Sequence, residues 1–159
     1  MHAPIEKTRQ EVRNARAEKR AHAVACGVDE QFVSIMVESF YASIRKDDLL
    51  ASIFAHRISD WPEHLERMKT FWRSILFNSG EFSGNPMAKH MAIPDLEERH
   101  FARWLELFYA TLQSLEAQPD GTALVAQRAR AIADSLFTGI SIRRDGLAGS
   151  KAGRNLPHV

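Results

Sequence analysis

The chain has 159 residues, of which 45% are hydrophobic and 26% are charged, and its formal net charge is +1. These values are typical of one soluble globular domain. No run of about 18 apolar residues occurs, and the first residues lack the apolar stretch of a signal peptide, so we expect neither a membrane span nor secretion. Cys26 is the only cysteine, which excludes an intrachain disulfide and favours a cytoplasmic protein.

The charge is unevenly distributed along the chain. Residues 1–21 and residues 143–159 each carry a net charge of +3, which leaves −5 on the part between them. Residues 1–28 have no apolar stripe, so we expect a flexible extension or a solvated helix outside the core, and residues 143–159 are expected to form a disordered basic tail. Neither end interleaves aromatic residues with its charges, which argues against contact with nucleic acid or a membrane.

The first strong helix is predicted from about residue 29 to residue 45. Its apolar side chains recur with the 3.6-residue period of a helix that buries one face, and Asp29 is a suitable N-cap. This face consists of Phe32, Val33, Met36, Val37, Phe40, Tyr41 and Ile44. A short segment follows the helix and ends at Phe54.

The second helix is expected to begin at Ser59 or Asp60, with Pro62 in its first turn, and to end near Phe77. At spacings of four, three and four residues, one face carries His64, Met68, Phe71 and Ile75. The sequence that follows, NSGEFSGNP, is typical of a loop.

This loop leads to a short helical turn that carries His90. Asn85 followed by Pro86 can start such a turn, because Pro fits the first helical position and Asn fits the cap. Pro94 then ends the segment. His90 therefore lies between two prolines, in a position that is usually at the surface.

Two further helices are predicted in the rest of the chain. Asp95 and Glu98 resemble a capping box that opens a helix ending near residue 117. The run QPDG is interpreted as a turn, and a last helix is expected over about residues 122–142. No strand-like alternation and no internal repeat occur, so the fold class is all-α with four main helices in a domain spanning residues 29–142.

Several catalytic patterns are absent from the sequence. It contains no Gly-rich phosphate loop, no HExxH motif and no pair of cysteines for zinc or an iron–sulfur cluster. What remains is a set of histidines and large side chains on helix faces: Tyr41, His64, Met68, Phe71, Trp72, His90 and Trp104. Each also suits an ordinary core or surface position, so spacing alone predicts only an all-α protein with an aromatic-lined interior.

A series of motifs within about residues 30–142 resembles a known family. The series consists of SFYASIRKDDLLASIF, WPEHLERMKTFWRSIL, GEFSGNPMAKH and FARWLELFYATL, in this order and at family-like distances. Together these motifs resemble the third group of the truncated haemoglobins. The resemblance implies a globin-like, two-over-two helical sandwich around haem b.

The resemblance also implies a role for individual residues. His90 matches the proximal ligand of the haem iron, and Tyr41 and Trp104 match distal residues that face the bound gas. His64 matches a distal position where this group often has histidine, acting as a gate or a donor. Met68, one turn further, is expected to line the distal pocket.

The remaining matches concern the macrocycle and its propionates. Arg67 lies where a basic side chain can reach the propionates, and Lys89 is a second, weaker candidate. The residues expected to pack against the macrocycle or hold the distal wall are Phe40, Phe54, Phe71 and Trp72. His56 and His100 are other iron ligands in principle, but neither matches the proximal segment.

Two distal donors imply that a diatomic ligand is held tightly. Donors aimed at such a ligand in a dry pocket stabilise it more than they would in water. Slow release suits chemistry on the ligand better than oxygen delivery. We therefore expect a haem protein that binds dioxygen, nitric oxide and carbon monoxide, with nitric-oxide dioxygenase or peroxidase-like activity on peroxide. No flavin or nicotinamide motif is present, so an external reductase is implied.

Two other functions stay open from the sequence. The two +3 ends favour a haem-free helical interaction domain with basic arms, whereas the ordered motif series argues against it. A haem-based gas sensor would need a partner, because the chain has no recognisable output domain. A monomer is favoured, although the sequence does not fix the oligomeric state.

Overall fold

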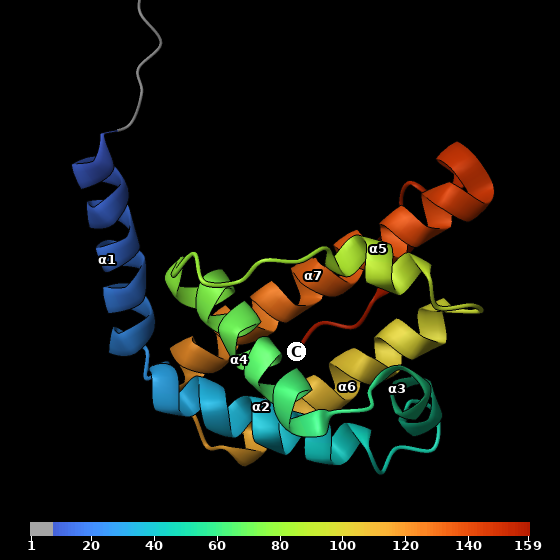
Figure 1. Cartoon of the computed structure of the whole chain (residues 1–159), viewed down its shortest axis with the longest axis horizontal. Helices are drawn as coiled ribbons and strands as arrows, with labels where there is room; N and C mark the ends of the chain where they lie inside the picture. Colours follow the sequence, from blue (N-terminus) through green and yellow to red (C-terminus); the bar gives the residue numbers. More distant parts are fainter. Residues whose placement is uncertain (1–7) are drawn as a thin grey trace, which may run out of the picture.

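The computed structural model describes residues 8–159 as an all-α fold (Figure 1), as predicted. Its elements are α1 (Arg9–Ala25), α2 (Glu30–Ile44), α3 (Ala51–Arg57), α4 (Trp61–Phe77), α5 (Pro86–Met91), α6 (Glu98–Ser114), α7 (Pro119–Asp145) and the 3-10 turns η1 (Gly146–Gly149) and η2 (Ala152–Asn155). Helix α2 packs against α4 and α6, and α6 packs against α7, so two helix pairs enclose the core. None of the helices in residues 8–159 has the length and apolar character needed to cross a membrane.

Three helices begin at side-chain caps that the sequence predicts. Asp29, Asp60 and Asn85 each accept a hydrogen bond from the backbone N–H three residues further on, at 2.8, 3.1 and 3.1 Å. Pro62 and Pro86 occupy the first turns of α4 and α5, where a missing N–H costs nothing. The predicted starts of α2, α4 and α5 are therefore confirmed.

An aromatic cluster fills the centre of the core. The ring of Phe108 stacks on those of Trp72 and Trp104, with centroids 5.1 and 5.4 Å apart. Phe40 meets Phe108 edge-on at 5.1 Å and is only 1% exposed. Such pairs add to the hydrophobic gain of burial, and here they fix the position of Trp104 on α6.

The predicted start and end of α6 are wrong. Asp95 has a φ of 61°, which lies in the left-handed region and outside the helix. Helix α6 begins at Glu98, and the N–H of Glu97 donates to Nδ1 of His100 at 2.9 Å. The ring of His100 therefore occupies the position that the carboxylate of a capping box would take. The helix ends at Ser114, three residues earlier than expected.

The run QPDG begins α7 and is not a turn. Pro119 is its first residue, and the helix extends to Asp145, beyond the predicted end at residue 142. Gly121 is buried because its Cα lies against the carbonyl group of Cys26, where a Cβ would overlap. This close approach attaches the first turn of α7 to the junction between α1 and α2.

The N-terminal extension contributes to the core more than we expected. Most of α1 is exposed, and its first turns project beyond the bundle (Figure 1). Helix α1 packs against α4, however, and Ala23 in its last turn and the following Val28 are fully buried. Small side chains at one helix end produce no apolar stripe, which is why the sequence pattern did not reveal this contact. Residues 1–7 of the extension lie outside the described residues.

The C-terminal segment is ordered, which contradicts the expected disordered tail. Tyr109 donates its hydroxyl to the carbonyl oxygen of Pro157 at 2.7 Å, and Arg130 donates to the carbonyl oxygen of Leu156. The side chain of Leu156 is only 2% exposed. Burial of this one apolar side chain, together with these hydrogen bonds, holds the segment against α6 and α7.

The corner between α2 and α3 depends on a buried carboxylate. Asp47 accepts the backbone N–H groups of Leu49 and Leu50 at 3.2 and 3.1 Å. Arg103 of α6 donates Nε to the same carboxylate at 2.8 Å. The corner is thereby attached to α6 next to Trp104.

We predict that Asp47→Ala lowers the free energy of unfolding by about 2–3 kcal/mol, because two N–H groups and one guanidinium lose their partner. The matched control is Glu106→Ala, which removes the exposed second partner of Arg103 and should cost less than about 0.5 kcal/mol. Urea unfolding of the three proteins measures the difference. Equal, small losses in both variants would show that Asp47 does not hold the corner.

Candidate functional site

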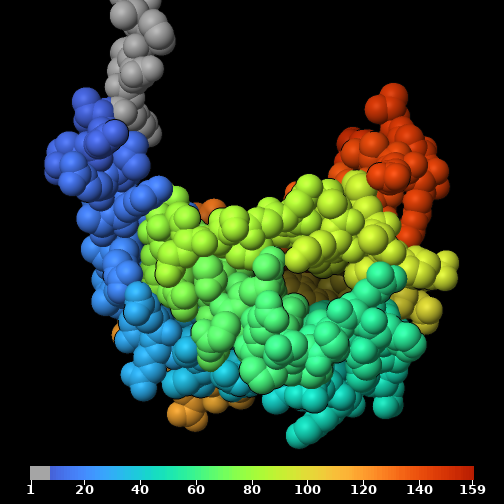
Figure 2. Space-filling view, in the orientation of Figure 1, coloured from blue at the N-terminus to red at the C-terminus, as the bar shows by residue number. Residues whose placement is uncertain are grey.

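A cavity of about 480 Å³ opens between α5 on one side and α3 and α4 on the other (Figure 2). Most of the side chains that line it are apolar or aromatic, and its volume is in the range of small-molecule sites. The charged side chains among its described lining residues are all basic: Arg57, Arg67 and Lys89. The cavity therefore suits a largely apolar ligand with an anionic edge.

The structure brings all but one of the predicted site residues to this cavity. From that set, the lining contains Tyr41, Phe54, His64, Arg67, Met68, Phe71, Trp72, Lys89, His90 and Trp104. Phe40 is the exception, because it lies behind the wall. Its ring meets those of Tyr41 and Trp104 edge-on at 5.1 and 5.3 Å, so Phe40 supports both residues from the core.

Two of the lining residues that the sequence did not predict, Arg57 and Phe82, bear directly on the shape and charge of the cavity. Helix α3 continues past Phe54, where we expected the segment to end, and its last residue Arg57 reaches the cavity. Phe82 lies in the loop after α4, packs edge-on against Phe71 at 5.2 Å and lies under the guanidinium of Arg67. A loop residue belongs to no periodic pattern, so the sequence held no signal for Phe82.

His90 lines the cavity from α5 in a form that suits metal binding. Its Nδ1 lies 2.6 Å from the carbonyl oxygen of Pro86, one turn earlier in the helix. A carbonyl oxygen only accepts, so Nδ1 carries the proton and Nε2 keeps its lone pair. Burial lowers the pKa of His90, which keeps the imidazole neutral at pH 7. A neutral imidazole oriented by a carbonyl is the usual form of a histidine ligand.

The two other histidines considered as ligands differ from His90. His100 also lines the cavity, but its Nδ1 accepts the N–H of Glu97, so the neutral ring carries its proton on Nε2. His56 has the same arrangement as His90, with Nδ1 2.6 Å from the carbonyl oxygen of Ser52, but it is exposed and outside the cavity. Of the three, His90 alone combines a free Nε2 with a place in the cavity.

His64 and Tyr41 lie together on another wall. The two rings meet edge-on at 5.1 Å, and Trp61 packs against the ring of His64 at 5.7 Å. Nε2 of His64 is buried without a hydrogen-bond partner, the one such side-chain atom found in residues 8–159. A buried nitrogen without a partner is costly, which indicates that this wall is built to face a ligand.

The titratable groups on this wall are neutral at pH 7. The pKa of His64 is lowered by burial and then by the positive charges of Arg67 and Lys89. Burial raises the pKa of Tyr41, so its hydroxyl stays protonated. The wall therefore presents a phenol donor beside a neutral imidazole.

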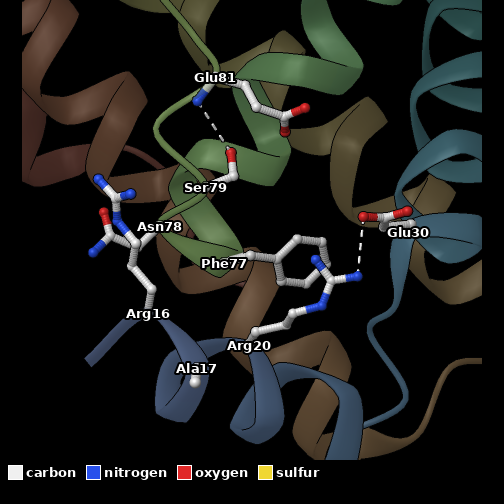
Figure 3. A pocket seen from close by; sticks show the side chains of 8 residues that line it. All are labelled: Arg16, Ala17, Arg20, Glu30, Phe77, Asn78, Ser79 and Glu81. Carbon is white, nitrogen blue, oxygen red and sulfur yellow. Dashed lines mark hydrogen bonds and ion pairs between the residues drawn. The ribbon is translucent and has the colours of Figure 1, made fainter. Parts of the chain in front are cut away.

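A second, shallower hollow lies between α1 and the end of α4 (Figure 3). Its lining includes Arg16, Arg20, Glu30, Phe77 and Glu81. Arg20 is paired with Glu30 at 3.0 Å and lies over the ring of Phe77. The guanidinium of Arg20 thus already has a carboxylate and an aromatic ring as partners. These two contacts attach α1 to α2 and α4.

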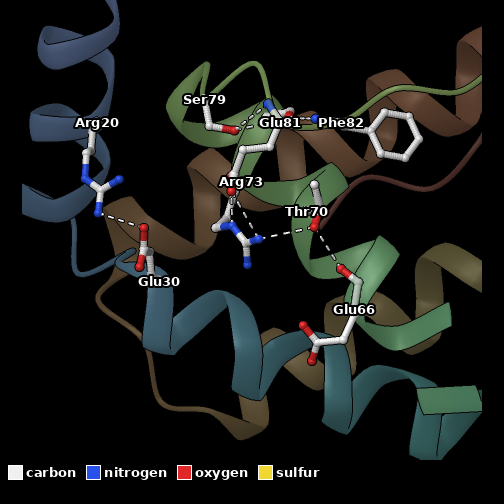
Figure 4. Close-up of polar contacts among 9 residues, drawn as sticks. Arg20, Glu30, Glu66, Thr70, Arg73, Ser79, Glu81 and Phe82 are labelled. Carbon is white, nitrogen blue, oxygen red and sulfur yellow. Dashed lines mark hydrogen bonds and ion pairs between the residues drawn. The ribbon is translucent and has the colours of Figure 1, made fainter. Parts of the chain in front are cut away.

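Further polar contacts fix the loop that leads to α5 (Figure 4). Arg73 of α4 donates to Glu81 at 3.0 Å and to the hydroxyl of Thr70 at 3.2 Å. The N–H of Phe82 donates to the hydroxyl of Ser74 at 3.0 Å. These contacts attach the loop to α4 and direct Phe82 toward the cavity.

Comparison with known proteins assigns the chain to a family. No protein-family model matches the chain. A curated relative, Group 3 truncated hemoglobin ctb from Campylobacter jejuni, is 30% identical over 110 residues, which cover 67% of this chain and 86% of the relative. The crystal structure of group III truncated hemoglobin from Campylobacter jejuni matches with a TM-score of 0.64 and 29% identity, covering 69% of this chain and 88% of that one. The chain therefore belongs to the group III truncated haemoglobins, a family of haem globins that bind small gases such as oxygen.

Proposed function

We propose that the cavity holds haem b with His90 as the proximal ligand, and that dioxygen and other diatomic gases are held at the opposite wall by Tyr41 and Trp104. The observation that carries this proposal is the 2.6 Å hydrogen bond from Nδ1 of His90 to the carbonyl oxygen of Pro86. It leaves Nε2 as a neutral donor atom in an apolar cavity, which is the ligand chemistry that haem iron accepts from globins.

The residues of the cavity fit haem. Its apolar and aromatic lining, which includes Phe54, Phe71 and Trp72, suits a flat macrocycle, and Arg67 and Lys89 offer positive charge for the propionates. The unpartnered Nε2 of His64 gives the distal wall a polar atom that a ligand can satisfy. Haem would supply an iron atom whose open coordination position binds diatomic gases.

Tyr41 and Trp104 would act as hydrogen-bond donors to the gas. Tyr41 stays protonated at neutral pH because burial raises its pKa, and the indole N–H of Trp104 can only donate. Phe40 packs against both rings and keeps them in place. In a dry cavity, fixed donors stabilise negative charge on a ligand more than water does, so release of the ligand would be slow.

Slow release favours reaction of the ligand over oxygen delivery. We therefore include nitric-oxide dioxygenase or peroxidase-like activity in the proposal, with Met68 and His64 shaping the distal space. Electrons would come from a separate reductase, and the protein would act as a cytoplasmic monomer. The two neutral donors beside the cavity, Tyr41 and Trp104, support reaction of the bound ligand. The single, buried Cys26 supports the cytoplasmic location.

His90→Ala should abolish or strongly alter the Soret absorption band that the haem-loaded protein shows and that carbon monoxide shifts. The matched control is His56→Ala, because His56 makes the same bond to a backbone carbonyl but lies outside the cavity. Spectra of the reduced proteins, with and without carbon monoxide, measure the effect. An unchanged band in His90→Ala, or no band in the unsubstituted protein after haem is added, would contradict the proposal.

Tyr41→Phe combined with Trp104→Phe should raise the dioxygen dissociation rate roughly 30-fold, because two hydrogen bonds of about 1 kcal/mol each are lost. Stopped-flow displacement of dioxygen by carbon monoxide measures the rate. Tyr109→Phe is the control, since that hydroxyl bonds Pro157 away from the cavity. If the double variant releases dioxygen at the unsubstituted rate, distal hydrogen bonding is not the source of retention.

The pH dependence of gas binding should reflect the lowered pKa of His64. Its ordinary value is 6.5, and burial with Arg67 and Lys89 moves it down, so His64 is already neutral at pH 7. Gas association rates should therefore change little between about pH 8 and pH 7, and the acid transition should be centred below pH 6.5. The acid change should be absent from His64→Leu. A transition centred above pH 6.5 that this substitution removes would contradict the lowered pKa.

A further inference from the structure

The position of His90 depends on what holds the two ends of α5. This helix has only six residues, and a helix so short is not stable through its own hydrogen bonds. Asn85 caps its first turn. Its other end continues into residues 92–97, which reach α6 and bring Ile93 and the buried Leu96 to the cavity wall.

Arg57 holds the end of α5 from the far side of the cavity mouth. Its Nη2 donates to the carbonyl oxygen of Ala92 at 3.2 Å, and Ala92 is the C-cap of α5. The last carbonyl groups of a helix lack partners within the helix, and a positive charge near them is favourable. The bond thus connects α3, on one side of the mouth, with the helix that carries His90 on the other.

Two arginines of α7 bind the segment of residues 91–97 from the side of α7. Arg144 donates Nη1 to the carbonyl oxygen of Leu96. Arg143 donates Nη1 to the sulfur of Met91 at 3.5 Å, a weaker contact because thioether sulfur is a poor acceptor. Both arginines belong to residues 143–159, which we expected to form a disordered basic tail.

We propose that Arg57 and Arg144, with a weaker contribution from Arg143, form an arginine clamp on residues 91–97 that positions His90 for the haem iron. The proposal rests on the proposed role of His90 as the iron ligand. Guanidinium groups make charge-assisted hydrogen bonds, which are stronger than neutral ones. They join the segment to α3 and α7, whereas the chain itself joins it to α5 and α6. Arg57 and Arg144 are thus positioning residues that act through the backbone next to His90.

The test uses the haem-loaded full chain with Arg57→Met, Arg144→Met and both together, since methionine keeps an apolar stem and removes the donors. Each single variant should lose haem to an excess of haem-free acceptor globin roughly tenfold faster, and the double variant faster still. The iron–histidine stretching band of the ferrous protein, measured by resonance Raman, should shift or broaden. Arg57→Lys should lose haem more slowly than Arg57→Met, because lysine keeps a hydrogen-bond donor.

Arg13→Met is the matched control, because Arg13 also donates to a backbone carbonyl, that of Arg9, but on the exposed face of α1. Arg13→Met should leave the rate of haem loss and the iron–histidine band unchanged. The melting temperature of the haem-free variants should stay close to that of the unsubstituted protein. A loss of stability in the haem-free state large enough to account for the faster haem loss would overturn the positioning role.

Two further outcomes separate the clamp from the proposed function. A double variant with unchanged haem loss and an unchanged iron–histidine band would overturn the clamp while leaving His90 as the ligand. Absence of that band from the unsubstituted protein would contradict the ligand role itself. Should Arg144→Met fail to fold, the iron–histidine band of Arg57→Met decides, because Arg57 also lines the cavity and haem loss alone would not separate positioning of His90 from contact with haem.

Discussion

The hydrogen bond between Nδ1 of His90 and the carbonyl oxygen of Pro86 is the interaction on which the proposed function depends. It selects one tautomer of the imidazole and leaves Nε2 as the free donor atom. The bond joins residues one turn apart, so it requires α5 to be helical, and α5 is too short to be helical without help. The cap at Asn85, the packing of α5 on α7 and the arginines around residues 91–97 all preserve this one turn.

The wall that would hold the gas in the proposed site draws on three parts of the chain that only the fold brings together. Tyr41 comes from α2, His64 from α4 and Trp104 from α6. Packing of Phe40 and Phe108 against Tyr41 and Trp104 leaves little freedom for these two rings, so the proposed donors would be oriented before a ligand arrives. Family membership makes a haem globin the setting for this arrangement and removes the reason to prefer a haem-free interaction domain.

Features set by local chemistry could be predicted from the sequence, whereas features set by distant contacts could not. The starts of α2 and α4 depend on Asp29 and Asp60, which bond N–H groups three residues away, and both predictions were confirmed. The cap of α6 failed because the ring of His100 takes the place that a carboxylate was expected to fill. Phe40 and Tyr41 are neighbours on α2 and point about 100° apart, and the surrounding helices decide that Tyr41 lines the cavity while Phe40 supports it from the core. The order of the C-terminal segment arises from burial of Leu156, which no periodic pattern reveals.

The most direct test of this account is a ¹⁵N NMR measurement of the histidine tautomers in the haem-free protein near pH 8. The account predicts that neutral His90 carries its proton on Nδ1, whereas His100, whose Nδ1 accepts the N–H of Glu97, carries it on Nε2. Opposite tautomers in two histidines that line the same cavity would show that the protein prepares His90 alone as a ligand. A proton on Nε2 of His90 would contradict the account, because no lone pair would then be available at the cavity.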